Sequence, residues 1–83
     1  MQAGQVVFSK CGRDKGRVFI VFSVLGDFVF LVDGALRPLS RPKKKKIKHT
    51  QQSKVVLTLP PNLKDIKDAD VRKWLLPFVG GGN

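Results

Sequence analysis

The stretch SKCGRDKGRVFIV, residues 9–21, places the glycine-bounded basic segment GRDKG directly before an apolar run. Gly12 and Gly16 can take a positive φ without a steric penalty, and Asp14 can hydrogen-bond to the backbone of a turn. β-branched and aromatic residues dominate on both sides of the segment, as is typical of strands. The stretch therefore predicts two strands that are joined by a basic loop.

Further short apolar runs extend this hairpin into a sheet. We expect three antiparallel strands in a meander, at Gly4–Ser9, Arg17–Val24 and Phe28–Val32, with a short fourth strand near Leu36–Leu39. The run KVVLTLPPN, residues 54–62, can supply a closing strand that ends at its two prolines. Strands with so few polar residues, in so short a chain, favour a sheet that curls on itself. The predicted fold class is mainly β, a small SH3-like barrel.

The segment DADVRKWLLPFV, which begins at Asp68, is typical of a short C-terminal helix. We predict this helix over residues 68–76, with Asp68 as its cap and Pro77 at its end. Its apolar stripe consists of Val71, Trp74 and Leu75, which recur at helical spacing and should pack against the barrel. Residues 79–83 are expected to form a flexible tail.

Length and composition restrict the class of protein. A chain of 83 residues has room for one domain, residues 1–83, with a thin core. No segment approaches the roughly 18 apolar residues of a membrane span. The single cysteine, Cys11, cannot form an internal disulfide, so we expect a cytoplasmic protein. Cys11 and the lone His49 are too few for a metal site or a catalytic triad, and we expect no enzyme activity, no metal and no cofactor.

Charge is concentrated in one part of the chain. Sixteen Lys and Arg against six Asp give a formal net charge of +10. Residues 37–49 hold seven of the basic residues and no acidic one. Such crowding carries a cost in self-repulsion that a bound polyanion would relieve. The charge pattern therefore favours a partner rich in phosphate.

The basic loop and its flanking strands resemble the KOW motif of ribosomal and transcription-elongation proteins. The positions that carry this likeness are Gly4, Val7, Gly12, Lys15, Gly16 and Val21. In KOW proteins a strand, a glycine-centred loop and a second strand form one edge of an SH3-like barrel, and the loop commonly contacts RNA. Phe19 stands where many KOW proteins have a further glycine, so the second strand should begin less sharply bent here.

A wider set of residues is similar to a narrower family. GQVVFSKCGRDKGRVFIV, VDGALRPLSRPKKKKIKH and DADVRKWL look like the fourteen-e type of large-subunit ribosomal protein, in particular its short bacterial relatives described as KOW-domain RNA-binding proteins. The likeness covers about residues 3–76. It implies ribosomal RNA binding within an SH3-like barrel, without catalysis. We expect a ribosome-associated protein that is monomeric when free and has neighbouring ribosomal proteins as a further class of partner. A constitutive ribosome component, an assembly factor and a regulator all fit the resemblance.

Two groups of residues form the predicted RNA-binding surface. The loop supplies Lys10, Gly12, Arg13, Asp14, Lys15, Gly16 and Arg17. The second group is a basic extended segment over residues 41–49, anchored by Ile47, together with a preceding arginine; its contributors are Arg37, Arg41, Lys43, Lys44, Lys45, Lys46, Lys48 and His49. Arg13 is expected to make the specific contact, because its planar guanidinium can pair with two phosphate oxygens or a base edge.

The four consecutive lysines should contact phosphates without discrimination. Neutralising about seven phosphates would give a slope of log K against log salt of roughly −5. Phe19, beside the loop, is a candidate for base stacking, although most phenylalanines of so small a barrel should be buried. Two other functions stay open: a KOW module that binds a transcription or ribosomal protein, and a nucleic-acid chaperone without a fixed site.

Overall fold

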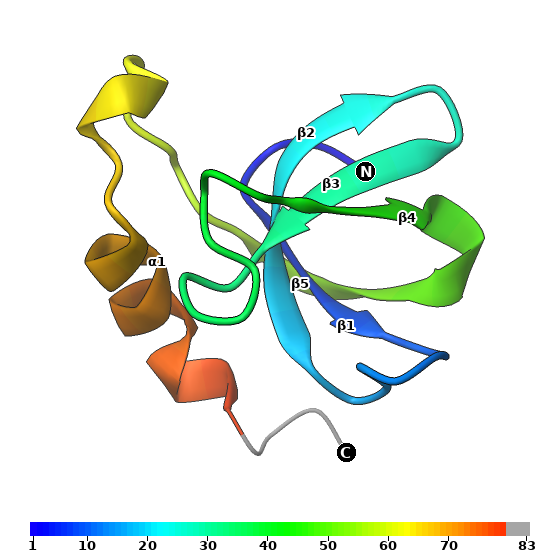
Figure 1. The fold of residues 1–83 in the computed structure, drawn as a ribbon. Coiled ribbons are helices and arrows are strands. Elements are labelled where there is room, and N and C mark those ends of the chain that lie inside the picture. The colour runs from blue at the N-terminus through cyan, green and yellow to red at the C-terminus, as the bar shows by residue number, and fades with distance from the viewer. Residues whose placement is uncertain (80–83) are drawn as a thin grey trace.

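The computed structural model describes residues 1–79, apart from the side chain of Leu63. Within these residues it has five antiparallel strands in one sheet and one short α-helix (Figure 1). The strands are β1 (Gln5–Ser9), β2 (Val18–Leu25), β3 (Phe28–Val32), β4 (Lys43–Lys46) and β5 (Thr50–Val56). The helix is α1 (Asp68–Leu75), and the 3-10 helices are η1 (Ile47–His49), η2 (Leu63–Asp65) and η3 (Leu76–Phe78). The predicted mainly β fold is confirmed, and it is consistent with a small SH3-like barrel.

The sheet has the strand order β4-β3-β2-β1-β5. β4 and β5 stand at the two ends of this order, yet η1 joins them through three residues. So short a connection requires the outer strands to meet at that end, and the sheet is therefore curled (Figure 1). The β1–β2 loop leaves the sheet beside this closure, because the backbone N–H of Lys10 donates to the carbonyl of His49 in η1 at 2.9 Å.

Two apolar clusters lie on opposite faces of the sheet, which explains why β1, β2 and β3 are almost continuously apolar. One cluster fills the inside of the curl and contains Val7, Phe19, Val21, Val29 and Leu31, with Ile47 packed against it. The other lies beneath α1 and contains Val6, Ile20, Val32, Ile66, Val71 and Leu75, with Trp74 packed against it. Successive side chains of a strand point to opposite faces, so neighbours such as Val6 and Val7 enter different clusters. The predicted roles of Ile47 as an anchor and of Trp74 in helix packing are confirmed.

Two predicted strands are placed differently in the structure. Residues 36–39 form no strand, because the carboxylate of Asp33 accepts hydrogen bonds from the backbone N–H groups of Ala35 and Arg37 and holds this segment in a turn. The fourth strand is instead β4, inside the predicted extended segment, where Lys43–Lys46 pairs with Leu31–Phe28 of β3. The closing strand β5 lies earlier than expected, because it begins at Thr50 directly after η1.

The predicted C-terminal helix is confirmed, with a correction at each end. The residue before the helix is Lys67, whose backbone N–H donates a hydrogen bond to the carboxylate of Asp70 at 3.1 Å. Asp68 is not the cap; its carboxylate accepts the backbone N–H of Leu39 at 2.8 Å and ties α1 to the β3–β4 connection. α1 ends at Leu75, two residues before Pro77, and Pro77 lies in the 3-10 helix η3 that follows. The expected flexible tail, residues 79–83, falls outside the described residues beyond Val79.

Candidate nucleic-acid interface

The β1–β2 loop, residues 10–17, is a closed turn with its basic side chains on the outside. Its base is closed by hydrogen bonds between Ser9 and Arg17 and between Ser9 and Gly16, at 3.0 and 2.9 Å. Gly12 and Gly16 have φ values of +88° and +86°, as the sequence predicted, and side chains at these positions would strain the backbone. The exposed basic residues of this loop are Lys10, Arg13, Lys15 and Arg17.

Asp14 points inward from the loop and connects it to β4. Its Oδ1 accepts hydrogen bonds from the Ser9 hydroxyl at 2.8 Å and from the Lys45 ammonium at 3.1 Å. Its Oδ2 has no hydrogen-bond partner and lies 3.6 Å from the Lys43 ammonium. Lys45 also donates to the carbonyl of Cys11 at 3.0 Å. Asp14 was expected among the RNA-binding residues, but its carboxylate faces Ser9, Lys45 and Lys43 within the protein, so its role is to position the loop.

Burial and neighbouring charges change the pKa of Asp14 in opposite directions. Burial raises the pKa of its carboxyl, but the hydrogen bonds from Ser9 and Lys45 and the charges of Lys45 and Lys43 outweigh burial and leave the pKa below its ordinary value. The ionised form is therefore the one that the fold stabilises. A carboxylate held in this way fixes the loop against β4 throughout the neutral pH range.

The four lysines of β4 do not form one row, because a strand alternates its side chains. Lys43 and Lys45 share the face of their partners Leu31 and Val29 and turn toward Asp14; the Lys45 side chain is only 8% exposed. Lys44 and Lys46 are exposed on the other face. Phosphate contacts were expected from all four lysines, whereas the ammonium of Lys45 is buried and ion-paired with Asp14 in this structure.

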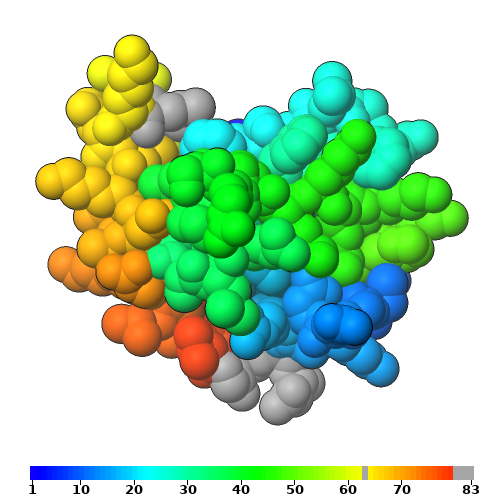
Figure 2. Space-filling model, in the orientation of Figure 1, coloured from blue at the N-terminus to red at the C-terminus, as the bar shows by residue number. Residues whose placement is uncertain are grey.

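The remaining predicted residues divide between two places. Lys48 is exposed and His49 is half-buried in η1, next to the base of the loop. Arg37 and Arg41 lie in the β3–β4 connection, where Arg41 is exposed and Arg37 is half-buried with its backbone bound to Asp33. In Figure 2 the green β3–β4 segment and the blue β1–β2 loop lie on the same side of the molecule. The structure thus brings the loop next to β4, through the contacts of Asp14 with Lys43 and Lys45.

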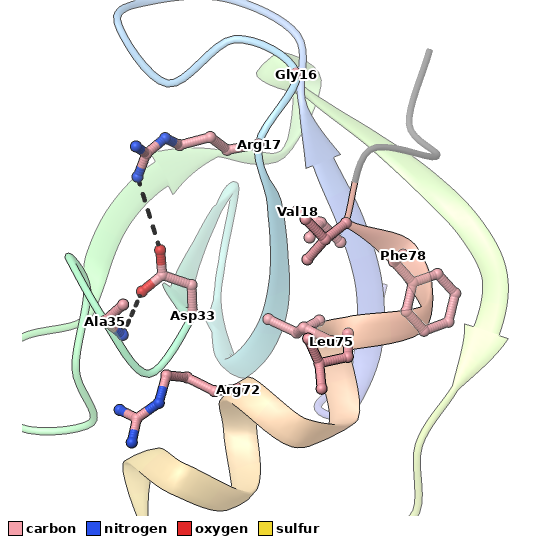
Figure 3. A pocket seen from close by; sticks show the side chains of 10 residues that line it. Gly16, Arg17, Val18, Asp33, Ala35, Arg72, Leu75 and Phe78 are labelled. Carbon is pink, nitrogen blue, oxygen red and sulfur yellow. Dashed lines mark hydrogen bonds and ion pairs between the residues drawn. The ribbon is translucent and has the colours of Figure 1, made fainter.

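An open groove of about 460 Å³ lies between the base of the β1–β2 loop and the C-terminal helices (Figure 3). One side is charged: Arg17 lies 4.0 Å from the carboxylate of Asp33, and Arg72 donates a hydrogen bond to the carbonyl of Gly34. The other side is apolar and is lined by Val18, Leu75, Leu76, Phe78 and Val79. Cationic and apolar groups therefore face each other across the groove.

A second hollow, of about 530 Å³, lies where the β2–β3 turn meets β4 and η1. It is lined by Asp27, Phe28, Lys46, Ile47 and Lys48. The Lys44 ammonium lies 4.4 Å from the centre of the Phe28 ring. Phe28 was not among the predicted site residues, whereas Phe19, the predicted stacking candidate, is 1% exposed and cannot reach a base. Side chains along the strand Phe28–Val32 point alternately to its two faces, and this alternation could have separated the half-buried Phe28 from the buried Val29 and Leu31.

Two kinds of feature, a helix able to cross a membrane and a cluster of metal ligands, are not found in residues 1–79. No helix there has both the length and the apolar composition needed to cross a membrane. No three His, Cys, Asp or Glu side chains of this part of the chain are grouped as metal ligands would be. The models of known protein families give no match to the chain, and no curated protein matches it either.

Proposed function

We propose that this chain binds structured ribosomal RNA without catalysing a reaction, and that it grips the RNA through the β1–β2 loop and β4. The observation that carries the proposal is the pair of ion contacts from Asp14 to Lys43 and Lys45, which hold the loop against the basic strand. The cations of the loop and of β4 are thereby held in one part of the molecule, with Lys44 and Lys46 on the face of β4 that is turned away from Asp14. The net charge of +10 and the likeness of the loop and lysine segment to large-subunit ribosomal proteins support ribosomal RNA as the polyanion.

The two segments would contribute differently to binding. Lys44, Lys46 and Lys48 are flexible point charges that contact phosphates and add affinity with little discrimination. Arg13 has a planar guanidinium on a fixed loop, and Gly16 of the same loop, with nothing within 4 Å of its Cβ position, lets the RNA backbone approach closely. Arg13→Ala should therefore reduce the preference for one RNA over another, whereas Lys44→Ala should weaken binding to all RNAs equally. Equal effects of both substitutions would reduce Arg13 to a further phosphate contact.

The proposal is tested by sedimentation of cell extract followed by RNA crosslinking. The protein should travel with large-subunit fractions, leave them at high salt and crosslink to one region of ribosomal RNA through the loop or β4. Crosslinks scattered over unrelated RNAs would support a chaperone without a fixed site instead. Sedimentation away from ribosomal fractions at every salt concentration, without crosslinked RNA, would reject RNA binding altogether.

A second candidate function is supported by the groove beside α1. The side chain of Leu76 is 67% exposed at its edge, and Leu36, next to groove residue Ala35, is 63% exposed. Together with Arg17 and Arg72, these side chains suit an apolar peptide segment that carries acidic residues, such as an exposed stretch of a ribosomal or transcription protein. In the same gradient, loss of association with Leu76→Lys but not with Arg13→Ala would favour this function. The opposite result favours RNA binding.

A further inference from the structure

The outer face of β3 and β4 interleaves aromatic and basic side chains. Phe28 pairs with Lys46 and Phe30 pairs with Lys44 in the antiparallel register. Residues that lie opposite each other in a sheet share a face, so these four side chains stand on the same face. We call this set, Phe28, Phe30, Lys44 and Lys46, the aromatic–lysine face.

This face lies beyond the area that α1 covers. Val32 of β3 belongs to the cluster beneath α1, but neither Phe28 nor Phe30 packs against that cluster or against the cluster inside the curl. Both rings are only half-buried. By contrast, Phe22 and Phe78 pack against the helix-side cluster, and Phe19 is fully buried. Phe28 and Phe30 are therefore not needed to complete either apolar cluster.

The surroundings of Phe28 combine the groups that bind an unpaired nucleotide. The ring lines the second hollow with Lys46 and Lys48, which supply positive charge on either side of Ile47. Asp27, which also lines the hollow, is an acceptor of the kind that the amino groups of adenine, guanine and cytosine can bond. A stacked base between flanking cations is the common arrangement at single-stranded nucleic-acid sites.

The Lys44 ammonium over the ring does not prevent stacking. It sits on a flexible four-carbon stem, and an exposed cation–π contact is weaker than the stacking of a base on the same ring. A phosphate that enters with the base would also offer the ammonium a stronger partner than the ring. Binding of a nucleotide would therefore move Lys44 from the ring to the backbone of the RNA.

We propose that Phe28 stacks an unpaired base of the bound RNA while Lys44, Lys46 and Lys48 hold the phosphates on either side of it. This inference rests on the proposed RNA-binding function and deepens it, because it assigns the lysine strand to a single-stranded element of the RNA. The β1–β2 loop, which offers cations but no exposed aromatic ring, is left to contact the folded parts of the RNA, with Arg13 as its specific contact.

The test compares affinities for a short single-stranded RNA and for the duplex that it forms with its complement. Phe28→Leu keeps an apolar side chain but removes the ring, and it should lower the affinity for the single strand about tenfold. Affinity for the duplex should not change, because its bases are already stacked. Phe28→Tyr keeps the ring and should bind as the wild type does. Phe8→Leu is the matched control, since Phe8 is also half-buried but lies on β1.

The possible outcomes separate the two proposals. Wild-type affinity of Phe28→Leu for the single strand would overturn stacking while RNA binding by the chain stands. An equal loss on single strand and duplex would also overturn it, because the ring would then act only through the shape of β3 and β4. A wild-type protein that binds neither RNA would overturn the proposed function together with this inference. Placing an abasic site at each position of the single strand should weaken wild-type binding at one position and leave Phe28→Leu unaffected there.

Discussion

Asp14 is the residue that connects the β1–β2 loop to β4. Its carboxylate is 14% exposed and is surrounded by the Ser9 hydroxyl and the ammonium groups of Lys45 and Lys43. Removal of one member of a buried ion pair leaves the other charge uncompensated, at a cost of about 3 kcal/mol. In a domain of this size that is a large part of the free energy of unfolding. The contacts of Asp14 are therefore needed for the stability of the domain as well as for the position of the loop.

The first prediction concerns acid stability. Because the folded pKa of Asp14 lies below its unfolded value, the stability that this carboxylate contributes is complete above the unfolded pKa of about 3.9. It is lost as the pH falls through the folded pKa. Urea denaturation from about pH 6 to about pH 2 should show a drop in the free energy of unfolding in this range. Asp14→Asn should be less stable at neutral pH and should show a smaller drop.

Asp27→Asn is the matched control for this measurement. Asp27 is exposed and makes no ion pair among the described residues, so the substitution should change the free energy of unfolding by less than about 0.5 kcal/mol. An acid profile of Asp14→Asn that matches the wild type would contradict the assigned role of Asp14.

At the scale of elements, β4 shows how alternation divides four identical residues into two functions. Lys45 is enclosed by Asp14 and the Cys11 carbonyl, whereas Lys44 lies over Phe28 in contact with solvent. Lys45→Met should lower the free energy of unfolding by about 3 kcal/mol, because Asp14 stays buried without its hydrogen-bonded partner. Lys44→Met should cost less than about 1 kcal/mol, the value of an exposed cation–π contact, and should weaken RNA binding instead.

Urea midpoints and RNA affinities of the two variants, measured side by side, check this prediction. Each substitution removes one positive charge from the same strand, so any effect of net charge is equal in both. Equal loss of stability in the two variants would mean that the four lysines are interchangeable, and the assignment of their faces would then be wrong.

The connection between β3 and α1 yields a further prediction. Gly34 has a φ of +78°, and a Cβ there would lie 2.4 Å from the backbone oxygen of Asp68 in α1. Gly34→Ala should therefore destabilise the domain by more than the roughly 1–2 kcal/mol of a left-handed backbone alone. Gly26 also has a positive φ, of +57°, but nothing lies within 4 Å of its Cβ position.

Gly26→Ala is accordingly the control for backbone strain without a steric clash. Thermal unfolding of both variants should show a clearly larger decrease in Tm for Gly34→Ala. Similar decreases in the two proteins would mean that α1 is not held as close to the β3–β4 connection as the contacts of Gly34 and Asp68 indicate.

Two strands, β3 and β4, show where a sequence pattern is enough to predict an element and where it is not. Phe28–Val32 was predicted with the correct bounds because five apolar residues between turn signals leave few alternatives. Lys43–Lys46 was predicted only as an extended segment, since lysine is uncommon in strands. Its strand conformation depends on pairing with β3 and on Asp14, which is about thirty positions away in the chain. Such contacts between distant residues are not visible in local composition.

For the whole molecule, the sequence predicts the fold class, but it does not predict which apolar side chain enters which of the two clusters. Neighbours such as Leu31 and Val32 are both apolar, and only the position of α1 decides which of them lies inside the curl. The same limit applies to the site. The basic loop and the lysine segment were identified from charge, but the inward direction of Asp14 and Lys45 follows from contacts between residues that are far apart in the chain.

The last prediction concerns the salt dependence of RNA binding by the whole basic surface. Of the loop and β4–η1 cations, Lys45 is buried and Lys43 is paired with Asp14, while Arg17 lies toward Asp33. Six remain exposed for phosphate contact: Lys10, Arg13, Lys15, Lys44, Lys46 and Lys48. At about 0.7 per phosphate, they give a slope of log K against log salt of roughly −4, shallower than the −5 expected from the sequence.

The slope is measured by titrating RNA at a series of salt concentrations. Lys44→Ala should make it less steep by about 0.7, whereas Lys73→Ala, an exposed lysine on α1, should leave it unchanged. A slope near zero would remove the electrostatic mechanism, and a slope steeper than −5 would mean that RNA draws Lys43 and Lys45 away from Asp14.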